Sequence, residues 1–291
     1  MKALDGFKVV NIAINIPGPT AAMRLHELGA AIVKVEPPSG DPTALVSRAY
    51  YERLTEGQEI VTLDLKRPED RTQLDNYLEK ADLLLTAHRT AALERLKLDW
   101  AALHRAFPRL CQVAIVGRCA PHDNEPGHDL TYQARCGLLN PPEMPRVLVT
   151  DLGAAEHAAT MAAALLLARE RGADAAYAQV AIEDAGHFFA LPLNHGFILD
   201  GPLGGGLPAY RLYRARDGYI AVAALEVRLL ERLERALEIK RAARPELERI
   251  FATRSAQEWE EWATERGLPI AAVRGPNFDW NDTPRAMPGG S

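Results

Sequence analysis

The stretch that decides the fold is PRVLVTDLGAAEHAATMAAALLLARERG, residues 145–172 of a 291-residue chain. A β-branched run at residues 147–150 predicts a short strand, and the small side chains after it predict a helix that ends near Gly172. Asp151 would then lie at a helix N-terminus, where its carboxylate can accept hydrogen bonds from free N–H groups. Capping alone is the simpler interpretation. The small-residue surface beside Asp151 also admits a slim ligand, so a chemical role is the second interpretation.

The composition argues against several classes of partner. The chain carries a net charge of -5, with 25% charged and 47% hydrophobic residues, which disfavours nucleic acid and anionic membranes as partners. Its three cysteines, Cys111, Cys119 and Cys136, have no metal-ligand spacing, and an odd number fits a reducing compartment. No N-terminal signal segment and no apolar run long enough to cross a bilayer is visible. We therefore expect a cytoplasmic protein.

The first part of the chain alternates strand and helix patterns, which predicts an α/β fold with a Rossmann-like, doubly wound parallel sheet. The carboxyl ends of such strands hold the ligands, and here these ends lead into loops near residues 15–19, 36–41, 86–90 and 117–128. The first of these loops contains Pro17, Gly18 and Pro19 and lacks the G-x-G-x-x-G fingerprint of dinucleotide-binding sites.

A different pattern follows the alanine-rich helix, so we place a large Rossmann-like domain at residues 1–186 and a small α+β domain at residues 187–291. A hairpin is predicted around the turn at residues 216–218, amphipathic helices at residues 226–240 and 255–266, and a coiled tail at residues 277–291.

Eight segments, taken together and in order, resemble family III CoA-transferases and α-methylacyl-CoA racemases. They are LDGFKVVNIA (residues 4–13), LHELGAAIVKVEPPSGDP (25–42), VTLDLK (61–66), ADLLLTAHRTAALERL (81–96), PGHDLTYQARCG (126–137), TDLG (150–153), GGGLPAYRLYRARDGYIAVAALE (204–226) and RSAQEWEEWA (254–263). The resemblance implies an enzyme that acts on acyl-CoA, with CoA as part of the substrate and no metal or redox cofactor. It also implies a homodimer of two interlinked chains.

The resemblance suggests two roles for Asp151. In transferases the matching aspartate is a nucleophile that takes the acyl group as a mixed anhydride. In racemases it is one of two acid/base groups beside the α-carbon, and the second is a histidine, here His128, supported by a glutamate, here Glu226. Proton transfer at a carbon α to a thioester needs a base on one face and an acid on the other, whereas anhydride formation needs only the carboxylate. The presence of all three residues favours a racemase or epimerase.

The same reading predicts further contacts. Backbone N–H groups near Gly153 would steady the enolate oxygen, and the acyl group would lie on the alanine-rich helix, near Phe188, Phe189 and Tyr210. Contacts to the CoA portion are expected from Arg89, Lys34, Pro17 and Asp64.

Two alternatives stay open beside the racemase. One is a CoA-transferase with Asp151 as nucleophile. The other is a divergent member with a different ligand, a carrier-tethered substrate or a partner role. It is suggested by Glu56, Gln58 and Glu59, which stand where relatives carry Arg and Lys. Relatives also continue beyond the position matching Ser291, which leaves open whether an interlinked dimer forms.

Overall fold

The computed structural model describes residues 2–199 and 201–275. The chain divides into two units, residues 1–190 and 191–291. Their boundary, between residues 190 and 191, lies within helix α9 (Ile182–Asn194), four residues after the predicted one. The coiled tail predicted at residues 277–291 lies outside the described residues.

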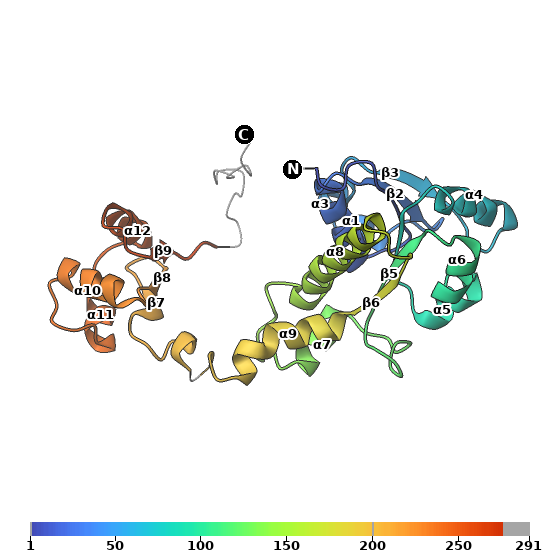
Figure 1. The fold of residues 1–291 in the computed structure, drawn as a ribbon. Helices are drawn as coiled ribbons and strands as arrows, with labels where there is room; N and C mark the ends of the chain where they lie inside the picture. The colour runs from blue at the N-terminus through green and yellow to red at the C-terminus, as the bar shows by residue number, and fades with distance from the viewer. Residues whose placement is uncertain (1, 200, 276–291) are drawn as a thin grey trace. The chain divides into compact units, whose positions relative to one another are not determined.

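The first unit is built on a six-stranded sheet in the order β3-β2-β1-β4-β5-β6 (Figure 1). All neighbouring strands are parallel, so the predicted Rossmann-like, doubly wound architecture is confirmed. The strands are β1 (Lys8–Asn11), β2 (Ala31–Glu36), β3 (Glu59–Thr62), β4 (Leu83–Thr86), β5 (Cys111–Val116) and β6 (Tyr177–Ala181). The strand order reverses between β1 and β4, and a crevice is expected at the carboxyl ends of these two strands.

Helices cover both faces of this sheet. Successive strand side chains point to opposite faces, so Val9 enters one apolar core with helices α1 and α8, while Val10 enters the other with α4, α5 and α6. The bounds are α1 (Pro17–Glu27), α4 (Pro68–Leu78), α5 (Thr90–Leu96), α6 (Trp100–Ala106) and α8 (Val149–Glu170). Three short helices complete the unit: α2 (Pro42–Val46), α3 (Arg48–Thr55) and α7 (Asp129–Arg135).

Three local predictions were wrong. No strand forms at residues 147–150, because α8 begins at Val149. Helix α1 begins at Pro17, inside the expected turn, since proline is well tolerated in the first helical turn. The sequence pattern of residues 92–106 predicts a single helix, but the structure divides this segment between α5 and α6, because Lys97 adopts a left-handed conformation with φ 51°.

A buried ion pair fixes the loop after β2. The Lys34 side chain is fully buried and donates to Asp41 at 2.8 Å, and its Nζ lies 3.4 Å from Glu36. Asp41 also accepts from the backbone N–H groups of Asn15 and Thr43. Burial alone would raise the pKa of Asp41, but the hydrogen bonds from Lys34 and Thr43 more than offset it and hold the pKa below its ordinary value. The carboxylate thus stays charged inside the domain.

The second unit contains a three-stranded antiparallel sheet of β7 (Tyr210–Arg214), β8 (Tyr219–Ala223) and β9 (Ile270–Ala272). The predicted hairpin is formed by β7 and β8. A short 3-10 turn at Pro202–Gly204 precedes it, and helices α10 (Val227–Ala236), α11 (Arg244–Phe251) and α12 (Ala256–Glu265) follow. The helix α11 and the strand β9 were not predicted. The core forms around Tyr213, Phe251 and Trp259.

The length and apolarity needed to cross a membrane are not found in any helix of the described residues.

Replacing Asp41 with Ala should cost about 3 kcal/mol or more of unfolding free energy, because it leaves the Lys34 ammonium buried without its closest partner. Asp99→Ala is the matched control. Asp99 also caps a helix through its side chain but neutralises no buried lysine, so about 1 kcal/mol is expected. Urea unfolding of both variants measures the difference, and equal losses would contradict a neutralising role for Asp41.

Candidate active site

A cavity of about 210 Å³ lies at the carboxyl ends of β1, β4 and β5. Asp151 and His128 both line it, together with Arg89 and Pro17. Its other lining residues are Ile14, Asn15, Ala87, His88, Ile115, Val116, Gly117, Asp123, Glu125, Gly127, Tyr132 and Ile182. Three of the four loops predicted to bind a ligand, near residues 15–19, 86–90 and 117–128, contribute residues to the lining of this cavity. The two residues predicted as an acid/base pair therefore face one common space.

Asp129, not Asp151, caps the helix that carries Asp151. One oxygen of the buried Asp129 carboxylate accepts from the backbone N–H groups of Thr150 at 2.9 Å and Asp151 at 3.1 Å, and from the Thr150 hydroxyl at 2.6 Å. Its other oxygen accepts from Gln133 at 2.6 Å. The capping interpretation of Asp151 was thus wrong, since a residue from α7 satisfies these donors. The Asp151 side chain is left to face the cavity.

The Asp151 carboxyl is much less acidic than usual. Burial, and then the nearby negative charge of Asp129, raise its pKa to about 7. Both effects disfavour the ionised form, because the charge loses water and meets a like charge. At neutral pH the group is present in both protonation states, which is the condition for giving and taking protons.

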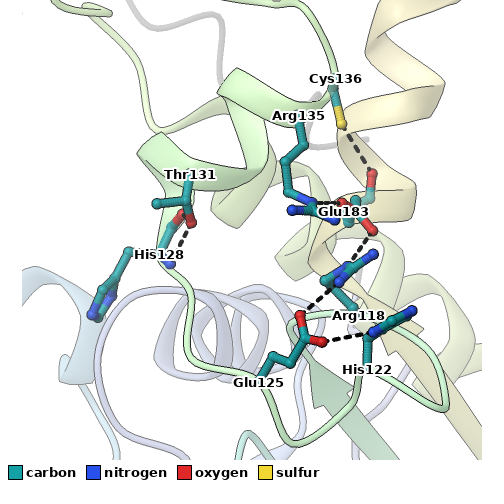
Figure 2. Close-up of polar contacts among 8 residues, drawn as sticks. All are labelled: Arg118, His122, Glu125, His128, Thr131, Arg135, Cys136 and Glu183. Atoms are coloured by element: carbon teal, nitrogen blue, oxygen red, sulfur yellow. Dashed lines mark hydrogen bonds and ion pairs between the residues drawn. The ribbon is translucent and has the colours of Figure 1, made fainter.

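His128 precedes α7 and is fixed through its backbone. Its N–H donates to the Thr131 hydroxyl at 3.1 Å, and its carbonyl accepts from the same hydroxyl at 2.7 Å. Figure 2 shows the imidazole pointing away from the neighbouring polar cluster. The side chain is exposed and lines the cavity that contains Asp151. A substrate can therefore approach the ring.

A network of ion pairs between side chains holds the loop that leads to His128. Glu183 of α9 accepts from Arg118 at 2.8 Å and from Arg135 at 2.6 Å (Figure 2). Arg118 also donates to Glu125 at 2.7 Å, and the Glu125 carboxylate lies 2.7 Å from Nδ1 of His122. These contacts tie the loop after β5 to α7 and to the start of α9, and so to both sides of the cavity wall.

Two more cavities continue along the same edge of the sheet. One, of about 200 Å³, is lined by Asp64, Lys66 and His88, among others. The next, of about 620 Å³, is lined by Leu65, Lys66, Ala92, Arg95, Leu96 and Lys97. His88 belongs to both the first and second cavities, and Lys66 to both the second and third. Lys66, Arg95 and Lys97 therefore line the second and third cavities, while Arg89 lines the first cavity with Asp151.

Lys34 is placed differently from the expectation. Its ammonium is sealed inside the domain by Asp41 and Glu36, and a contact with an external phosphate has no support in this geometry. The predicted CoA contacts are thus divided: Arg89 and Pro17 line the first cavity, Asp64 the second, and Lys34 none of the three within the described residues.

The acidic residues that suggested a non-CoA ligand lie at the other edge of the sheet. Glu56 and Gln58 precede β3, and Glu59 is its first residue. Since β3 is parallel to β2, these residues occupy the amino end of the strand. Glu56 is paired with Arg53, and Glu59 accepts from Tyr77. They would not repel a phosphate bound at the carboxyl edge.

The surroundings of Gly153 also differ from the expectation. Gly153 lies within α8, beyond the first-turn N–H groups that a helix leaves free, so its amide is not available to an enolate. A Cβ at this position would lie 2.2 Å from the Phe189 ring. Phe188, Phe189 and His157 line a separate pocket of about 370 Å³. Tyr210 belongs to the second unit.

Glu226 belongs to the second unit as well. It directly precedes α10, is exposed, and makes no capping hydrogen bond through its side chain. Its predicted contact with His128 stays a prediction.

Comparison with known proteins identifies the family. The pattern of CoA-transferase family III matches residues 4–283. The chain belongs to this family.

Relatives within the family include both kinds of enzyme. The human α-methylacyl-CoA racemase is 30% identical over 82% of this chain and 65% of its own length. A probable fatty acyl-CoA transferase of Mycobacterium tuberculosis is 31% identical over 63% of this chain and 51% of its own length. The chain thus spans between half and two thirds of these two relatives. The crystal structure of the M. tuberculosis protein matches 98% of this chain and 87% of its own, with a TM-score of 0.83 and 27% identity.

Three residues of this family III site were missed by sequence reasoning. Asp129 directly follows His128 in the sequence, and no local pattern shows that it caps the helix that begins at Val149. His88 stood beside Arg89 without a pattern of its own. Lys66 could have been found, because it follows β3 and therefore lies at the carboxyl edge.

In the described residues no group of three or more His, Cys, Asp or Glu side chains is arranged to hold a metal ion.

Asp151→Asn should raise stability increasingly as the pH rises from about 4 to about 7. The folded-state pKa of Asp151 is raised to about 7, so between about pH 4 and about pH 7 the unfolded chain releases this proton while the native protein keeps it. The native protein loses stability over that range, and the Asn variant does not. About 1–3 kcal/mol is expected above pH 7, allowing for partial exposure. Glu69→Gln, an exposed acid in the first turn of α4, is the control for the helix-dipole effect. Thermal unfolding of the variant and the unaltered protein over this pH range measures the effect. A stability difference that stays the same at all pH values would contradict the raised pKa of Asp151.

Proposed function

We propose that this family III protein is a racemase or epimerase of acyl-CoA thioesters. The observation that supports it is the convergence of Asp151 and His128 on one cavity, with the pKa of Asp151 raised to about 7. A group that is half protonated at neutral pH is suited to deliver a proton in one turnover and accept one in the reverse direction. The human racemase among the relatives supports the same chemistry.

In the proposed reaction the two side chains share one catalytic proton. In one direction neutral His128 takes the proton from the α-carbon, the electrons of the C–H bond move into the thioester as an enolate, and protonated Asp151 returns a proton to the opposite face. The products are the other stereoisomer, an imidazolium and a carboxylate. The reverse direction starts from this charged pair. No electron leaves the system, so the reaction needs no redox cofactor, and the CoA is part of the substrate.

The row of cavities supports CoA as the carrier of the acyl group. A CoA thioester is long, with its phosphates at one end and its reactive carbon at the other. Lys66, Arg95 and Lys97 line the outer cavities, and cations of this kind bind phosphate oxygens. Asp151 and His128 line the inner one. Arg89 and Pro17 also line the inner cavity, and Asp64 lines the next one, so these three residues would contact the parts of CoA nearer the thioester.

A CoA-transferase with Asp151 as nucleophile is the second candidate. It is supported by relatives such as the succinate–glutarate CoA-transferase of Agrobacterium fabrum, 24% identical over 76% of this chain and 62% of its own length. This chemistry would require Asp151 but not His128. For either enzyme we also propose a homodimer and a cytoplasmic location, as the sequence leads us to expect.

The racemase predicts deuterium incorporation at the α-carbon of a 2-methylacyl-CoA in heavy water, followed by mass spectrometry. Asp151→Asn and His128→Ala should each reduce exchange by a factor of about 100 or more, since each removes an acid/base group. His104→Phe, in helix α6 and outside the cavities, is the control. Transfer of CoA from an acyl-CoA to a free carboxylic acid that survives His128→Ala, with an acyl group on Asp151 that hydroxylamine traps, would select the transferase instead.

Charge reversal at the outer cavities should weaken CoA binding. Lys66→Glu and Arg95→Glu are each expected to raise the Kd of CoA about tenfold at low salt and less at high salt, because they replace attraction to phosphate by repulsion. Arg105→Glu makes the same change of charge on the exposed end of α6 and should have little effect. Calorimetry at two salt concentrations measures this, and three equal responses would refute a phosphate site here.

A further inference from the structure

His88 occupies the junction of the row of cavities. It follows β4, one of the two strands between which the strand order reverses. It lines both the cavity of Asp151 and the cavity of Lys66. A ligand that spans the two must pass this side chain. The inference that follows rests on the proposed binding of a CoA thioester.

The imidazole of His88 lacks a hydrogen-bond partner within the described residues. Its Nδ1 is buried and unpartnered, and burial lowers the pKa of the ring. The side chain is therefore neutral at pH 7 and carries its proton on one nitrogen only. A proton on Nδ1 would bury an N–H donor without an acceptor, which is costly. The favoured tautomer carries it on Nε2, the nitrogen left to meet a ligand.

The part of a CoA thioester at this junction follows from the two ends. In the proposed complex the reactive carbon is beside Asp151, and the phosphates are beside Lys66, Arg95 and Lys97, which line the outer cavities. The segment between them is the pantetheine arm, whose polar groups include two amides. An amide carbonyl is a neutral acceptor and matches a neutral N–H donor, whereas a phosphate would favour a charged partner.

We propose that His88 is a substrate-binding residue that donates a hydrogen bond from Nε2 to an amide carbonyl of the pantetheine arm. It thereby fixes how far the arm enters the inner cavity, and hence where the α-carbon lies relative to Asp151 and His128. Neither neighbour in the sequence can replace this contact, because Arg89 is charged and Ala87 has no side-chain donor. His88 is the neutral side-chain donor at this junction.

The test compares two ligands with two replacements of His88. His88→Phe keeps a ring of similar shape without the donor, and His88→Gln keeps an N–H donor near the position of Nε2. CoA contains the pantetheine arm, whereas 3′-phospho-ADP contains only the phosphates and the nucleoside. Calorimetry gives the Kd of each pair, and thermal unfolding checks that each variant folds.

The expected result is a Kd for CoA about three- to tenfold higher in His88→Phe, the size of one lost neutral hydrogen bond. His88→Gln should recover most of the affinity, and 3′-phospho-ADP should bind all forms equally. His104→Phe is the matched control, since His104 also has a buried, unpartnered Nδ1 but stacks on Trp100 at 4.7 Å outside the cavities. It should bind both ligands as the unaltered protein does.

Three outcomes would overturn the role of His88: unchanged CoA binding in His88→Phe, an equal loss for 3′-phospho-ADP, or no recovery in His88→Gln. Each leaves the proposed function intact as long as the unaltered protein binds CoA. Failure of the unaltered protein to bind CoA is a different result, which removes the proposed function and this contact together.

Discussion

The structure of the site depends on one carboxylate, that of Asp129. A single oxygen accepts from the Thr150 and Asp151 amides and from the Thr150 hydroxyl, so the start of α7 is joined to the start of α8. Helix α8 in turn packs against α1, β5 and β6. Because Asp129 satisfies these donors, Asp151 does not need to fold back on its own helix. The cap thus places the helix, frees the Asp151 carboxyl and supplies part of the charge that makes it less acidic.

Two carboxyl groups of the first unit have pKa values shifted in opposite directions. Asp41 is buried against the Lys34 ammonium, and the net effect holds its pKa below the ordinary value. Asp151 is buried near another acid without such compensation, and its pKa rises to about 7 despite the favourable end of the helix dipole. The first carboxylate stays charged and stabilises a loop, and the second exchanges protons at neutral pH. Surroundings, not residue type, assign these roles.

The sheet could be predicted from the sequence, but the cap and the buried pair could not. Strands such as β4 and β5 are buried throughout, so they appear as apolar runs between helical patterns. Residues 147–150 resemble another such run, but α8 begins at Val149, and Asp129 from α7 accepts the hydrogen bonds of its first turn. Lys34 resembles an exposed cation until its acidic partners are located. The acidic residues before β3 were misjudged for a simpler reason: strand direction already places them at the edge away from the ligand.

Separation of charge along the crevice is what makes the two functions of the site compatible. Phosphate binding needs cations, but a cation close to Asp151 would stabilise its ionised form and lower its pKa. The only causes that shift the pKa of Asp151 among the described residues are burial and Asp129. Lys66, Arg95 and Lys97 line the outer cavities, and Arg89, which lines the inner cavity, is not among the causes of that shift. A long ligand with its charge at one end and its reactive carbon at the other fits this division. A neutral donor between the two regions, such as His88, can position the ligand without disturbing the acidity of Asp151.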